Sequence, residues 1–107
     1  MKKVKIALLG LGNVGGGVYR ILTEDKKSII HREGIDCEVK YILVRDKNKK
    51  RDIEFPKEIL TDSFDEIIND DEIEIVAEFM GGVTPAKEYI LKSLKRGKSV
   101  VTANKEV

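Results

Sequence analysis

Hydrophobic residues are grouped along the chain in two patterns, short dense segments and longer segments at helical spacing. The short segments are rich in aliphatic, β-branched and aromatic residues, and they cover residues 3–9, 37–44, 73–80 and 99–102. Short runs of this kind, bounded by glycines or charged loops, are typical of buried strands. The pattern therefore predicts four strands distributed along the whole chain.

A segment with a helical period follows the first predicted strand. Val14, Val18 and Leu22 would share one face of a helix that begins near Asn13. The same pattern can continue through residue 30, and Gly34 would then stop it. We therefore expect one long helical region between the first two strands.

Two further helices are predicted in the second half of the chain. Ser63 and Glu66 have the spacing of a capping box, which predicts a short helix after Ser63. Thr84 and Pro85 have the form of an N-cap and a first helical position, and Gly97 would close that helix. Strands that alternate with helices imply crossover connections. The chain is thus predicted to be one α/β domain, residues 1–107, with a doubly wound, mostly parallel sheet. This sheet can lack the last strands of the complete fold.

Composition and charge narrow the class of function. Charged residues make up 36% of the chain, but 20 basic and 19 acidic residues leave a net charge of +1, which predicts no nucleic-acid partner. No apolar run is long enough to cross a bilayer, so we expect no membrane partner and a cytoplasmic location. A single cysteine, Cys37, and a single histidine, His31, offer neither an internal disulfide nor a cysteine-based metal site.

The first segment that carries chemistry is residues 10–15, GLGNVG, which fits the pattern G-x-G-x-x-G. It follows a predicted strand and opens a predicted helix, which is the context that a dinucleotide-binding turn requires. Gly10 would permit the tight turn, Gly12 would let a pyrophosphate approach the backbone, and Gly15 would let the helix pack closely on the strand. The N–H groups of the first helical turn would hold the phosphates. A glycine-rich turn without a ligand is the alternative.

The residue after the second strand of such a site selects the cofactor. A carboxylate there accepts hydrogen bonds from the adenosine ribose, whereas an arginine can bind a 2′-phosphate. This chain has Arg45 first, then Asp46, then further basic residues up to Arg51. The order favours NADP over NAD, and Asp46 keeps NAD open if its side chain, and not that of Arg45, points into the site.

Two later segments are more specific than the glycine turn, namely residues 76–86 (VAEFMGGVTPA) and residues 97–105 (GKSVVTANK). With residues 10–15 they make the whole chain resemble the NAD(P)-binding domain of homoserine dehydrogenase, most clearly at the start and from residue 76 onward. The resemblance implies a Rossmann-like fold. For the full-length protein it implies an NAD(P)-dependent oxidoreductase that interconverts L-homoserine and L-aspartate 4-semialdehyde on the route to threonine and methionine.

The family's site residues carry over only where the motifs match. The resemblance implies that Lys105, in the TANK segment, lies beside the nicotinamide and the substrate as a catalytic residue. It also implies that Leu11, Asn13 and Val14 line the pyrophosphate turn. The cofactor-binding residues expected from the motif and the resemblance together are Gly10, Leu11, Gly12, Asn13, Val14, Gly15, Arg45, Gly81, Gly82 and Lys105.

In the family, the regions for dimerisation and substrate binding lie beyond the part that this chain resembles. We therefore expect this chain to be the cofactor-binding fragment of a larger, homodimeric enzyme. We expect the fragment alone to be inactive. One alternative is a stand-alone nucleotide-binding or sensor module without catalysis, and a reading frame that continues past Val107 would argue against it. Another is a dehydrogenase similar to aspartate dehydrogenase, against which the TANK segment argues.

Overall fold

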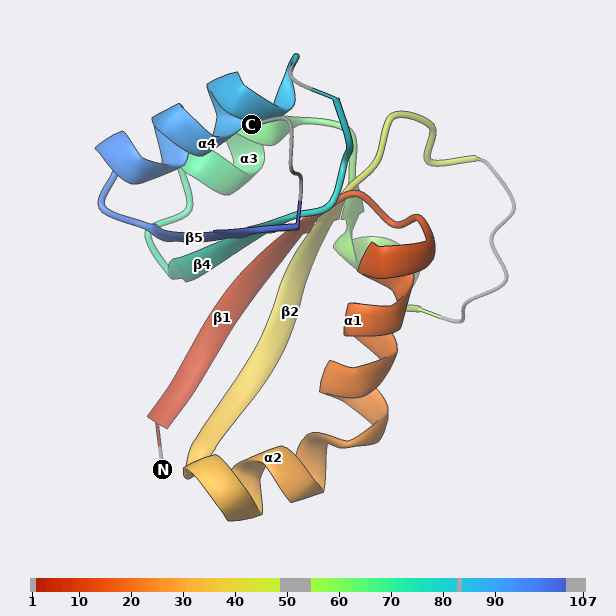
Figure 1. Cartoon of the computed structure of the whole chain (residues 1–107), viewed down its shortest axis with the longest axis vertical. Coiled ribbons are helices and arrows are strands. Elements are labelled where there is room, and N and C mark those ends of the chain that lie inside the picture. The colour runs from red at the N-terminus through yellow and green to blue at the C-terminus, as the bar shows by residue number, and fades with distance from the viewer. Residues whose placement is uncertain (1, 49–54, 83, 104–107) are drawn as a thin grey trace.

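In the part of the chain that the structure describes, five parallel strands form one sheet in the order β3-β2-β1-β4-β5 (Figure 1). The computed structural model describes residues 2–48, 55–82 and 84–103. Its helices are α1, α2, α3 and α4, with a short 3-10 helix, η1. The bounds are β1 Lys2–Leu9, α1 Asn13–Glu24, α2 Lys26–Glu33, β2 Ile35–Leu43, η1 Lys57–Ile59, β3 Leu60–Thr61, α3 Phe64–Ile68, β4 Ile73–Glu78, α4 Ala86–Lys95 and β5 Ser99–Thr102.

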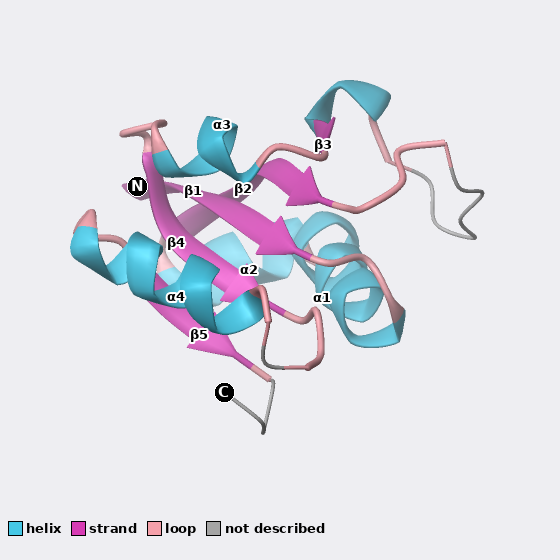
Figure 2. Cartoon of the chain, turned by 90° about the horizontal axis from the view of Figure 1, so that it is seen from above, coloured by secondary structure: helices cyan, strands magenta, loops and turns pink. Residues whose placement is uncertain are grey.

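The sheet is packed between two layers of helices (Figure 2). Alternate residues of β1 point to opposite faces, so Ile6 and Leu8 pack with Tyr19 of α1, whereas Leu9 packs with Phe64 of α3. On the α3 side, the ring of Phe64 stacks on Tyr89 of α4 with a centroid distance of 4.1 Å. A sheet buried on both faces explains why the second half of β1, residues 6–9, is a continuous apolar run. The predicted doubly wound fold is confirmed.

The structure corrects several predicted element boundaries. The long helical region divides at Asp25 into α1 and α2, and Gly34, with φ of 66°, ends α2 as predicted. Ser63 is the N-cap of α3, but its side chain makes no capping hydrogen bond, so the predicted capping box is wrong. Pro85, and not Thr84, is the N-cap of α4, because Pro85 has φ −90° and ψ 5° and helical geometry begins at Ala86.

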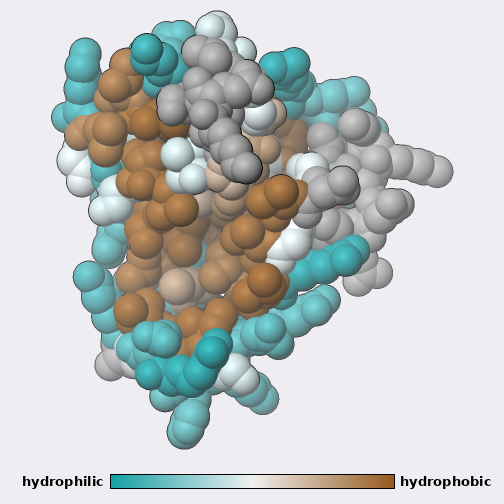
Figure 3. All heavy atoms as spheres, viewed as in Figure 1, coloured by the Kyte–Doolittle hydropathy of each residue, from teal (hydrophilic) through white to brown (hydrophobic). Residues whose placement is uncertain are grey.

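Hydrophobic surface remains on the α1 side of the sheet (Figure 3). Val14 and Ile21 of α1 and Val101 of β5 are each more than half exposed. Within the described part of the chain, no helix is long and apolar enough to span a membrane.

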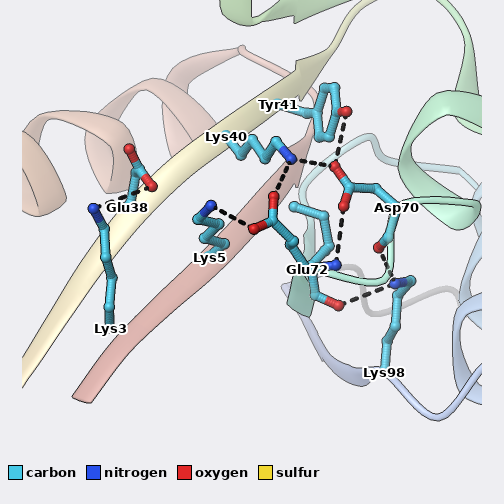
Figure 4. Close-up of polar contacts among 9 residues, drawn as sticks. Lys3, Lys5, Glu38, Lys40, Tyr41, Asp70, Glu72 and Lys98 are labelled. Carbon is cyan, nitrogen blue, oxygen red and sulfur yellow. Dashed lines mark hydrogen bonds and ion pairs between the residues drawn. The ribbon is translucent and has the colours of Figure 1, made fainter.

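A network of charged side chains fixes the turn before β4 to the middle of the sheet (Figure 4). Lys40 of β2 pairs with both Asp70 and Glu72, and the Tyr41 hydroxyl donates to Asp70 at 2.9 Å. The hydrogen bond from Lys40 lowers the pKa of Asp70 to about 2, against the opposing effect of burial. Lys98, which is 6% exposed, donates from Nζ to the carbonyl oxygens of Asp70 and Ile73.

Asp70→Asn should destabilise the chain at neutral pH by about 1–3 kcal/mol, because a charge-assisted hydrogen bond is lost in a largely buried position. The pKa of Asp70 lies below its ordinary value of 3.8. Its contribution to the free energy of unfolding is therefore present above pH 4 and is lost as the pH falls toward 2. Urea unfolding of parent and variant across this range measures the difference, with Asp71→Asn as the exposed control. A difference that stays constant down to pH 2 would contradict the assignment.

Candidate functional site

The turn between β1 and α1 brings strand and helix together at two glycines. Gly10 has φ of 103°, and an ideal Cβ there would lie 3.2 Å from the carbonyl oxygen of Phe79. At Gly15 a Cβ would overlap the carbonyl oxygen of Gly10. Any side chain at Gly15 would therefore push α1 away from β1. The structural roles predicted for these two glycines are confirmed.

Gly12 differs from both, because a Cβ there would meet nothing within 4 Å. Gly12 is the N-cap of α1, with extended backbone angles that other residues also adopt (φ −85°, ψ −154°). The first helical hydrogen bond runs from the Gly16 N–H to the Gly12 carbonyl at 2.8 Å, so the N–H groups just before Gly16 face out of the helix end. The first turn of α1 contains no acidic residue. This end of α1 is open and suited to an anion.

A cavity of about 530 Å³ lies in front of this turn, at the carboxyl ends of β1, β2 and β4. The chain runs outward from β1 to β2 and β3 and then returns to β4 on the other side of β1. The cavity therefore lies at the point where the strand order reverses, which is where ligands bind in open α/β sheets. Its wall is formed by Gly10, Leu11, Gly12, Leu43, Val44, Arg45, Asp46, Asp62, Phe79, Met80, Pro85 and Tyr89.

The end of the cavity beside β2 and β3 carries charge of both signs. Arg45 and Asp46, the two residues that the sequence offers for cofactor selection, line this end, and both are exposed. One carboxylate oxygen of Asp46 accepts a hydrogen bond from the Asn48 N–H at 2.9 Å. Asp62, which directly follows β3, lines the same end of the cavity. The sequence does not predict this position, because β3 is too short to be recognised from its pattern.

The other end of the cavity is formed by the segment after β4. Phe79 and Met80 line it, and the Phe79 N–H donates to the Leu9 carbonyl at 2.9 Å. Gly81 and Gly82 follow with positive φ, of 77° and 74°. Among the described residues, the wall of the cavity does not include Gly81 or Gly82.

The remaining expected residues are placed as follows. Gly15 is buried and Val14 is exposed on α1, and neither is among the described residues of the cavity wall. Asn13 is the first residue of α1. Lys105, expected to be catalytic, lies outside the described residues. Over the described ranges, no cluster of three or more His, Cys, Asp or Glu side chains could hold a metal ion.

An open parallel sheet with a glycine turn and a helix N-terminus at its switch point defines a domain of the Rossmann-like, dinucleotide-binding class. Within this class, residues 10–107 match the family model for the NAD-binding domain of homoserine dehydrogenase, and the chain belongs to this family. A nicotinamide cofactor follows from that membership.

Individual relatives agree with the family match. Homoserine dehydrogenase of Bacillus subtilis (strain 168) is 40% identical over the whole of this chain. The crystal structure of S. aureus homoserine dehydrogenase at pH 8.5 superposes with a TM-score of 0.93 at 46% identity, covering 100% of this chain and 27% of that chain. The crystal structure of a homoserine dehydrogenase from Thiobacillus denitrificans superposes with a TM-score of 0.81 at 34% identity. The match covers 97% of this chain and 24% of that chain. This chain spans about a quarter of the curated relatives' length, 25% for the B. subtilis protein.

Gly12→Val and Gly15→Ala should separate a glycine that serves the ligand from one that serves the fold. A Cβ added at Gly12 would meet no described atom within 4 Å, so Gly12→Val should change the free energy of unfolding by less than about 1 kcal/mol while abolishing dinucleotide binding. Gly15→Ala should destabilise the chain by about 1–3 kcal/mol through overpacking. Thermal unfolding and titration calorimetry measure both effects. Gly17→Ala, also with open space, is the control.

An unfolded Gly12→Val chain would show that Gly12 is required by the turn itself. Unchanged stability in Gly15→Ala would show that α1 can move away from β1 without loss.

Proposed function

We propose that the cavity at the carboxyl edge of the sheet is the binding site of a nicotinamide dinucleotide in a homoserine dehydrogenase, with the pyrophosphate at the N-terminus of α1. The observation that carries this proposal is the open space at Gly12 beside the outward-facing N–H groups of the first helical turn. A diphosphate needs close approach to the backbone and several N–H donors, and this position offers both.

The residues of the cavity fit the rest of a dinucleotide. Arg45, Asp46 and Asp62 would meet the adenosine ribose at the β2 side. Phe79 and Met80 would border the nicotinamide at the β4 side, with Gly81 and Gly82 following. The cofactor would supply hydride transfer. These residues would hold its two halves on either side of the point where the strand order reverses, and they would exclude water from one face of the cofactor.

We propose NADP(H) as the preferred cofactor. Arg45 is the first residue of the loop after Val44 that is both exposed and on the cavity wall, and its guanidinium can bind a 2′-phosphate in bidentate fashion. One oxygen of Asp46 accepts from the loop's own backbone, at the Asn48 N–H. That contact supports a role for Asp46 in shaping the loop around Arg45.

The activity of the whole protein is proposed from the family. We place residues 1–107 as the cofactor-binding domain of a homodimeric enzyme that interconverts L-homoserine and L-aspartate 4-semialdehyde, a step toward threonine and methionine. The substrate-binding residues would belong to the three quarters of the relatives' length that this chain does not span. Lys105, carried over from the family, would act beside the nicotinamide.

The 107-residue chain should bind NADPH but catalyse no reduction of aspartate 4-semialdehyde, because the described residues form the proposed dinucleotide cavity, whereas the chain spans only about a quarter of its relatives' length. Titration calorimetry measures the binding, and the absorbance of the reduced nicotinamide measures turnover. Absence of dinucleotide binding would contradict the proposed site. Turnover above a control without protein would show that the chain alone carries the substrate site.

Arg45→Ala should weaken NADP binding more than NAD binding by about 1.5–3 kcal/mol, since only NADP loses a charge-assisted contact. Lys47→Ala is the matched control, because Lys47 is an exposed cation of the same loop. Calorimetric titrations of each variant with both cofactors give the comparison. Equal losses of binding free energy for the two cofactors would assign the selection of NADP to another residue. A larger loss for NAD than for NADP would contradict the proposed contact between Arg45 and the 2′-phosphate.

A further inference from the structure

Glu78, the last residue of β4, is a completely buried carboxylate at the carboxyl edge of the sheet. Burial of a carboxylate is costly unless its oxygens accept hydrogen bonds. Both oxygens of Glu78 do so. Oε2 accepts from the Met80 N–H at 2.6 Å, and Oε1 accepts from the Thr102 hydroxyl.

The two donors belong to different segments. Met80 is in the segment after β4 and lines the cavity. Thr102 is the last residue of β5 and lies directly opposite Glu78 in the strand pairing. The backbone repeats this link, because the Ala103 N–H donates to the Glu78 carbonyl at 3.2 Å. One side chain therefore joins the exits of β4 and β5.

The link formed by Glu78 lies on one side of the cavity, so it should act on one half of a bound dinucleotide. The adenosine end is formed by residues after β2 and β3, on the other side of β1 from Glu78. A dinucleotide lies across the switch point, so the β4 side receives the nicotinamide half. A change at Glu78 should therefore affect one half of the cofactor and leave the other half bound as before.

We propose that Glu78 is a positioning residue for the nicotinamide half of the cofactor. Through Met80 it sets the course of the segment that borders the ring, and through Thr102 it ties that segment to the end of β5. This inference rests on the proposed function. Glu78 itself, being fully buried, does not touch the cofactor.

The test compares NADPH with 2′-phospho-ADP-ribose, which has the same adenosine half and pyrophosphate but no nicotinamide. Thr102→Val removes the hydroxyl that donates to Glu78 with little change in side-chain volume, and Thr102→Ser retains it. Glu78→Gln keeps the shape of the side chain but removes its charge. Glu74→Gln is the control, since Glu74 is an exposed glutamate on the same strand.

Thr102→Val and Glu78→Gln should each raise the Kd for NADPH about tenfold and change the Kd for 2′-phospho-ADP-ribose by less than about twofold. Thr102→Ser and Glu74→Gln should leave both ligands at the parent values. The fluorescence of bound NADPH, which reports the surroundings of the reduced ring, should change in Thr102→Val and not in Thr102→Ser.

Equal losses for the two ligands, or unchanged binding of both, in folded Thr102→Val would overturn the positioning role while the proposed function stands. A parent chain that binds neither ligand would overturn the proposed function, and this inference with it. Thermal unfolding of each variant separates loss of positioning from loss of fold.

Discussion

The close approach of α1 to β1 is the constraint on which the rest of the site depends. A Cβ at Gly15 would overlap the carbonyl oxygen of Gly10, so the helix can begin at this place only if both positions lack side chains. The same contact directs the N-terminus of α1 across the carboxyl end of β1. The open space at Gly12 follows from that geometry, because the turn is held by its two outer glycines and an added Cβ at the middle one would meet no described atom within 4 Å.

The strand order gives this turn its surroundings. With β1 in the centre of the sheet, the segments that follow β2 and β4 lie on either side of the glycine turn, and together they form one cavity. Charged residues gather on the β2 side, whereas Phe79 and Met80 lie on the β4 side. An asymmetric cavity of this kind suits a ligand with two unlike halves joined by a pyrophosphate. Glu78 links the segment after β4 to the end of β5 on the side proposed to receive the nicotinamide, where its proposed role is to hold that segment in position.

The sequence patterns predict β1, β2, β4 and β5 because each is a short segment rich in aliphatic, β-branched or aromatic residues. Residues 10–15 are recognised because the glycines stand between a strand and a helix. The two residues of β3 are too few to show a period. The capping box at Ser63 fails because the pattern specifies residue types and not the rotamers that would form the hydrogen bonds. The link between Glu78 and Thr102 crosses 24 positions and depends on the register of β4 with β5, which local patterns do not contain. A glutamate at the end of an apolar strand is the one signal that points to it.

The proposed site requires that the N-terminus of α1 binds the pyrophosphate of a dinucleotide. Amide chemical-shift mapping of the ¹⁵N-labelled chain, titrated with ADP-ribose, tests it most directly. We expect the largest changes at the amides of the first turn of α1, with smaller changes at Arg45 and Met80 and none at Gly97 near the amino edge of β5. Changes concentrated at the amino edge of the sheet, or no changes at saturating ligand, would contradict it.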